Sequence, residues 1–138
     1  MRTVLVALSA GLISCGAALA EGNLASKPTR LDPLVLNKDL SMSVKEYQLS
    51  TGKYYKWTVE SKGGDEFRIS APELFRNSWI DQIVINDIEV KPMGGIYGVE
   101  FDEPGKADIW FVPVRPGNYE FYVPGQQERG MIGKFIVR

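Results

Sequence analysis

From residue 55 to the C-terminus, apolar and polar side chains alternate in short runs. Tyr55, Trp57 and Val59 are separated by polar residues, and this period of two is typical of a β-strand with one buried face. Runs with the same pattern recur at residues 67–69, 97–101, 109–111, 119–123 and 131–137. Pro-Gly pairs divide the later runs at the spacing expected of a sandwich or barrel. The pattern predicts an all-β fold, which we interpret as a β-sandwich.

One segment departs from this alternation and predicts a short helix. Residues 70–73, with the sequence Ser-Ala-Pro-Glu, fit a capping box that has proline in the first helical turn. Leu74, Phe75 and Ile80 would then lie on the apolar side of this helix. The fold class is therefore a β-sandwich with one short helical insertion.

Shorter strand signals flank the predicted helix. Residues 82–85 and 88–90 resume the strand pattern, and the Asn-Asp pair at 86–87 is a plausible turn between them. Residues 21–42 are mixed in character and contain two prolines, so we interpret them as an N-terminal leader. Within this leader we predict one edge strand near residues 34–36.

The first twenty residues have the features of an export signal. A basic start is followed by an apolar run that is too short to span a bilayer and ends in Ala-Leu-Ala at 18–20. We predict a secretory signal peptide over residues 1–20, cleaved before Glu21, and a periplasmic mature protein without a transmembrane segment. Residues 12–16 also resemble a lipobox, which would give cleavage before Cys15 and lipid attachment to it. We favour the first interpretation because the Ala-x-Ala site is well formed.

The composition excludes several kinds of chemistry. The 138 residues include no histidine and a single cysteine, so a Ser-His-Asp triad, a His-ligated metal and an internal disulfide are all excluded. Sixteen basic residues against seventeen acidic ones give a net charge of -1. Nucleic-acid binders usually carry a clustered excess of Lys and Arg, so we expect no nucleic-acid partner.

Two separated motifs resemble those of the cupredoxins. Residues 116–133, PGNYEFYVPGQQERGMIG, are similar to the family's Tyr-x-Phe-x-Cys strand, followed by Pro-Gly-His and Gly-Met-x-Gly. Residues 65–67 and 71–75, DEF and APELF, resemble its His-x-Phe strand followed by Ala-Pro-Glu. The resemblance covers residues 43–138, and it implies a cupredoxin-like domain with a Greek-key sandwich there.

The same resemblance implies where the ligands of a type 1 copper centre would lie. It places the first His at Asp65, the Cys at Val123 and the second His at Gln126, while the weak axial Met is retained as Met131. A type 1 centre requires two imidazoles and a thiolate in a trigonal set. Valine offers no lone pair, and a carboxylate and an amide do not replace imidazoles. We therefore expect a degenerate copper site.

Each remaining candidate has a structural interpretation beside its functional one. Met131 is a possible soft ligand for Cu(I), but core packing explains it more simply. Asp65, Gln126 and their acidic neighbours Glu66 and Glu128 would suit a hard cation if they gathered at one end of the sandwich, although a solvated polar rim is the simpler interpretation. Trp110 lies between Ile109 and Phe111, whose side chains are expected to face the core. Because side chains alternate along a strand, the Trp110 side chain is expected on the opposite face, which makes it a candidate binding anchor.

These observations favour a binding or interaction protein over an enzyme. The sequence contains no nucleophile elbow, phosphate loop or metal signature. We expect a periplasmic protein partner and no cofactor, and analogy with the cupredoxins suggests a metal-handling or respiratory system. The alternative is a periplasmic carrier of copper or another metal that uses Asp65, Gln126 and Met131 as unconventional ligands.

Overall fold

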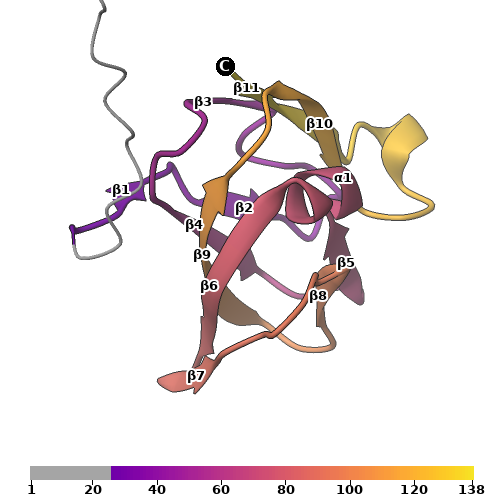
Figure 1. Cartoon of the computed structure of the whole chain (residues 1–138). Coiled ribbons are helices and arrows are strands. Elements are labelled where there is room, and N and C mark those ends of the chain that lie inside the picture. The colour runs from indigo at the N-terminus through magenta and orange to yellow at the C-terminus, as the bar shows by residue number, and fades with distance from the viewer. Residues whose placement is uncertain (1–25) are drawn as a thin grey trace, which may run out of the picture.

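Two β-sheets pack face to face in the computed structural model, which describes residues 26–138 (Figure 1). The first sheet has the order β1-β4-β9-β6-β7, with β2 also paired to β4, and its strands are β1 (Thr29–Arg30), β2 (Leu34–Leu36), β4 (Tyr55–Ser61), β6 (Ser78–Ile85), β7 (Ile88–Val90) and β9 (Gly105–Pro113). The second has the order β3-β11-β10-β5-β8, and its strands are β3 (Glu46–Leu49), β5 (Phe67–Ser70), β8 (Gly98–Phe101), β10 (Gly117–Tyr122) and β11 (Ile132–Val137). The predicted all-β sandwich is confirmed.

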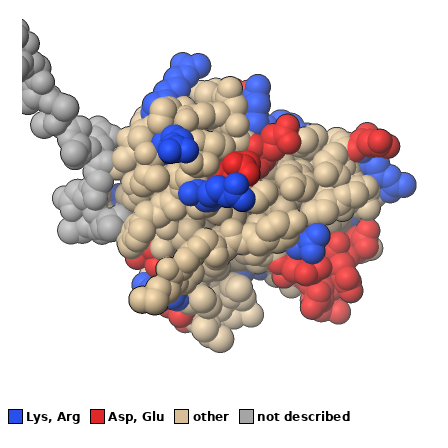
Figure 2. Space-filling view, turned by 45° about the vertical axis from the view of Figure 1, so that its right-hand side comes forward, with Lys and Arg blue, Asp and Glu red and all other residues tan. Residues whose placement is uncertain are grey.

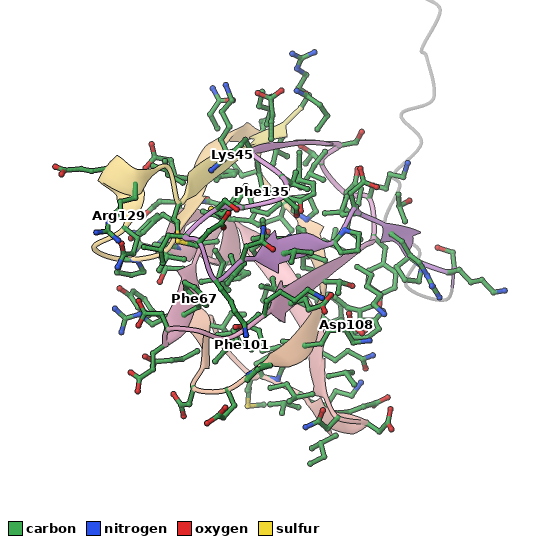
Figure 3. The ribbon with its side chains drawn as sticks, turned by 180° about the vertical axis from the view of Figure 1, so that it is seen from behind. Lys45, Phe67, Phe101, Asp108, Arg129 and Phe135 are labelled. Atoms are coloured by element: carbon green, nitrogen blue, oxygen red, sulfur yellow. The ribbon has the colours of Figure 1, made fainter. Side chains whose placement is uncertain are left out.

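The core between the sheets is built on the alternation seen in the sequence. Every second residue of β4 is buried, and Trp57 in its middle has no exposed surface. The Trp57 ring meets aromatic rings that come from β3, β10 and β11 of the opposite sheet, with centroid separations of 6.3 Å to Tyr47, 5.8 Å to Phe121 and 5.0 Å to Phe135. Figure 3 labels Phe135 among these packed side chains. Trp57 therefore contacts both sheets, and its burial agrees with the alternation of apolar and polar residues in β4.

The segment before residue 43 takes part in the first sheet. Both β1 and β2 pair with β4 in parallel, and Leu34 and Leu36 of β2 are fully buried. The strand predicted near residues 34–36 is confirmed. The predicted signal peptide and Cys15 lie outside the described residues. Between residues 26 and 138, no helix has the length and apolar character needed to cross a membrane.

The short helix α1 (Pro72–Arg76) is present, but two details of its prediction are wrong. Ala71 is the N-cap residue and no side chain caps the helix, because Ser70 is the last residue of β5 and its backbone follows the sheet. Ile80 lies in β6 and pairs with Phe111 of β9, since a five-residue helix ends before reaching it. Leu74 and Phe75 do lie on the buried side of α1.

The hairpin between β6 and β7 turns at the predicted pair. Asn86 and Asp87 have φ angles of 48° and 64°, and two successive positive values are those of a type I′ turn. The turn places Ile88 opposite Ile85 and makes β7 the outermost strand of its sheet. The hydrophobic β6–β7 hairpin therefore forms one edge of the first sheet.

Gly133 provides a test of the packing between β10 and β11. A Cβ atom at this position would lie 2.3 Å from Phe121 Cζ and 2.7 Å from the backbone oxygen of Lys45. We expect Gly133→Ala to lower the free energy of unfolding by about 1–3 kcal/mol, because the added methyl group overpacks the core. Urea unfolding measures this change. Gly95→Ala is the control, since its Cβ would meet nothing within 4 Å, and equal stability of the two variants would contradict the packing described here.

Candidate functional site

The loop between β10 and β11 brings together three of the four positions that the sequence motif marks as copper ligands. Val123 directly follows β10 and Met131 directly precedes β11, and both are buried. The Val123 N–H donates to the Met131 carbonyl at 3.0 Å, and the Met131 N–H donates to the Gln126 carbonyl at 3.1 Å. The short 3-10 turn η1 (Gln127–Arg129) completes the loop, and Arg129 lies on its exposed surface (Figure 3). Backbone hydrogen bonds therefore hold the loop closed.

The side chains on this loop do not fit a type 1 copper centre. Val123 has no donor atom, and the amide of Gln126 is a hard, neutral ligand. Met131 has no exposed surface and belongs to the hydrophobic core. A single buried thioether does not replace the two imidazoles and the thiolate that define such a centre.

Asp65, the fourth position, lies on the exposed chain just before β5. Its Oδ1 accepts a hydrogen bond from the Glu66 backbone at 2.9 Å. The ladder between β5 and β10 places Ser70 opposite Tyr122, the residue before Val123. Across residues 26–138, no three His, Cys, Asp or Glu side chains form a group that could hold a metal ion.

Trp110 lies on the outer face of the first sheet and is only partly exposed. The Lys56 ammonium lies 4.7 Å from the centroid of its ring, a cation–π arrangement. The same ammonium lies 2.8 Å from Asp108 Oδ2, and Thr58 Oγ1 donates to Asp108 Oδ1 at 2.6 Å. One side of the Trp110 ring is thus occupied by Lys56, within a polar network that includes Asp108. Asp108 is labelled in Figure 3.

This network predicts a measurable pH dependence of stability. Burial alone would raise the pKa of the Asp108 carboxyl, but hydrogen bonds from Lys56 and Thr58 and the positive charge of Lys56 together lower it. The stabilisation is therefore present above the ordinary carboxyl pKa of about 4 and is lost as the pH falls through the lower folded value. We expect Asp108→Asn to cost about 1 kcal/mol at neutral pH and progressively less on acidification.

Urea unfolding between neutral and acid pH checks this expectation. Asp102→Asn is the matched control, because Asp102 is exposed on the chain between β8 and β9. A constant difference between wild type and Asp108→Asn at every pH would contradict the assigned role of Asp108.

A second feature of the molecule is an exposed apolar surface between residues 79 and 97. Seven large hydrophobic residues are exposed among residues 26–138, and six of them fall in this interval: Trp79, Ile85, Ile88, Val90, Met93 and Tyr97. We call these six residues the 79–97 surface. Val114 is the seventh; it follows β9, and its N–H donates to the Asn77 carbonyl at 2.8 Å beside the start of β6. In Figure 2, uncharged side chains cover most of the visible face, and carboxylates gather along one side of it.

A groove of about 590 Å³ borders the 79–97 surface. It is formed by α1, the start of β6 and the loop that precedes β8, through Pro72, Phe75, Arg76, Ser78, Trp79, Ile80, Pro92, Met93, Gly94, Gly95, Ile96 and Tyr97. We call it the α1–β6 groove. Arg76 is the charged residue of this lining. Ser78 contributes a buried hydroxyl that has no hydrogen-bond partner among the described residues.

Sequence reasoning did not find this surface. Ile85, Ile88 and Val90 show the same alternation as the buried strands. Their exposure depends on β7 being the last strand of its sheet, which is a property of the strand order. The one local signal was the run from Pro92 to Gly95, which combines an apolar residue with glycines in a loop.

Solved structures with a similar fold include copper proteins. A Cu-containing nitrite reductase from Thermus scotoductus SA-01 gives a TM-score of 0.60 at 12% identity, covering 83% of this chain and 32% of its own. A multicopper oxidase from Campylobacter jejuni gives 0.55 at 11% identity, covering 81% and 30%. Auracyanin from the photosynthetic bacterium Roseiflexus castenholzii gives 0.52 at 18% identity, covering 77% and 94%. This chain therefore spans about a third of the length of the two larger proteins.

These similarities show a cupredoxin-like fold, as the sequence motifs imply. No protein-family model matches the sequence, and neither does any curated protein sequence. At such low identities the likeness concerns the fold alone, and function has to be argued from the residues of this chain.

Proposed function

We propose that this chain is a binding module, a cupredoxin-like sandwich without a type 1 copper centre that contacts another protein through the 79–97 surface. The observation that carries the proposal is the exposure of six large hydrophobic side chains in two groups, Ile85, Ile88 and Val90 in the β6–β7 hairpin and Trp79, Met93 and Tyr97 around the α1–β6 groove. Exposed apolar side chains that cluster on a soluble protein mark interaction sites. The module would act by binding and would not itself be an enzyme.

The position of these side chains suits a protein partner. Ile88 at the hairpin is 66% exposed, and the outer edge of β7 has no neighbouring strand among the described residues. Burial of apolar surface supplies about 25 cal/mol per Å², so a few such side chains contribute several kcal/mol to association. Aromatic residues such as Trp79 and Tyr97 are frequent anchors in protein interfaces.

The compartment follows from the predicted signal peptide, and the type of system follows by analogy. Export through a signal peptide would deliver the module to the periplasm. The copper proteins that share its fold suggest an accessory role in a metal-handling or respiratory system. This assignment to a pathway rests on analogy of fold.

The proposal is tested by site-specific photo-crosslinking in cells that make the protein. A photoreactive residue at Ile88 should capture one protein reproducibly, whereas the same residue at Thr29, exposed on β1 at the opposite edge of the sheet from β7, should not. The captured protein is then purified and its affinity for the module is measured by calorimetry. Equal capture at both positions, or no saturable binding by the purified proteins, would contradict the proposal.

A further inference from the structure

We infer that the α1–β6 groove binds an extended, largely apolar peptide segment that places a carboxylate opposite Arg76. This inference rests on the proposed function, because it specifies which kind of partner segment the module takes. It is carried by three properties of the groove, which are its apolar walls, its weakly paired arginine and its glycines.

Apolar side chains form most of the groove. Phe75 of α1 and Ile80 of β6 are buried and form the inner part of the lining. Trp79, Met93 and Tyr97 are exposed along it and belong to the 79–97 surface. A ligand that covers these exposed side chains must itself be largely apolar for the burial to be favourable.

Arg76 is the charged residue of the groove and has only a weak partner. Arg76 contacts Glu73 at 3.6 Å, and both side chains are largely exposed. Such a surface pair contributes little, which leaves the guanidinium available to a ligand carboxylate.

The glycines of the groove are not explained by packing within the chain. A Cβ atom added to Gly94 or Gly95 would meet nothing within 4 Å. Neither residue is among the glycines with positive φ, so their backbone conformation does not require glycine. Close approach of a partner's backbone does account for glycine at these positions.

Three short fluorescein-labelled peptides of about six residues, the length of an ordinary strand, test the inference. The first alternates Val and Ser and carries one central Asp, the second has Lys in place of Asp, and the third has Ser in place of every Val. Fluorescence anisotropy measures affinity, and NMR shifts of the Trp79 indole and of the Gly94 and Gly95 amides locate the bound peptide. We expect the Asp peptide to bind with saturation, the Lys peptide to bind about threefold to tenfold more weakly, and the Ser peptide not to bind.

Variants of the full chain separate charge recognition from unspecific adhesion. Arg76→Glu should reverse the preference between the Asp and Lys peptides, whereas Arg30→Glu, on β1 at the far end of the sheet, should leave it unchanged. Gly95→Ala should weaken binding of the Asp peptide without changing stability, because the added methyl group occupies space that the peptide needs.

Three results would overturn the inference. They are no saturable binding of the Asp peptide, equal binding of the Asp and Lys peptides, and NMR shifts confined to residues outside the groove. Self-association that Trp79→Ser abolishes would identify a second copy of the chain as the occupant and would also overturn it. If the purified crosslinked partner still binds through Ile88 while the peptides fail, the inference falls and the proposed function stands.

Discussion

Replacing Trp57 by alanine is expected to lower the free energy of unfolding by about 3–5 kcal/mol. Trp57 is fully buried and joins the two sheets through ring contacts with Tyr47, Phe121 and Phe135. Its removal leaves a large cavity where these rings meet, and the sandwich cannot close that cavity without moving a whole strand. A loss of this size is a large fraction of the stability of an ordinary domain.

Urea unfolding followed by far-ultraviolet circular dichroism measures the effect of Trp57→Ala. Trp110→Ala is the matched control, because it removes the same side chain from the outer face of the same sheet, where it is partly exposed. We expect the control to cost much less. If Trp57→Ala does not fold, Trp57→Phe serves in its place, with an expected cost of about 1–2 kcal/mol. Equal costs at positions 57 and 110 would contradict the position of the core.

The second large effect is expected on binding to the proposed partner protein. Trp79→Ser combined with Ile88→Ser should weaken association by about a hundredfold or more, because each removes an exposed apolar anchor from the 79–97 surface. Neither side chain fills the core, so the free energy of unfolding should change little. Calorimetry with the purified partner gives the affinity, and thermal unfolding confirms that the fold is intact.

Thr29→Ala is the control for this experiment. Thr29 is exposed on β1, at the opposite edge of the first sheet from β7. Its replacement should leave the affinity unchanged. A loss of affinity for Thr29→Ala as large as for the double variant would show that the partner does not recognise the 79–97 surface.

The sequence was most informative where a local pattern decides burial. The alternation around Trp57 and Phe135 predicted strands and an inward face, because side chains on a strand point to opposite sides. The turn at Asn86 and Asp87 was predicted from their residue types, and both residues have positive φ angles. The start of α1 was misjudged by one residue, since Ser70 remains in the sheet and cannot cap a helix.

The candidate site was less predictable because it depends on strand order and register. Motif similarity marked Val123, Gln126 and Met131, and the structure brings these residues together in one loop. It did not predict that Ser70 pairs with Tyr122 at the end of β10. It also missed the 79–97 surface, because Ile88 and Val90 look like core residues until β7 is known to be the last strand.

Copper titration of the purified mature protein tests the central claim, that a cupredoxin-like fold is present here without a type 1 copper centre. Calorimetry with Cu(I) and with Cu(II) at micromolar protein is expected to give no saturable uptake, and the Cu(II) mixture is expected to lack the intense colour of a copper–thiolate bond. Met131→Leu and Asp65→Ala should behave as the wild type does. Saturable uptake that either substitution weakens would contradict the claim and would favour a metal carrier with unconventional ligands.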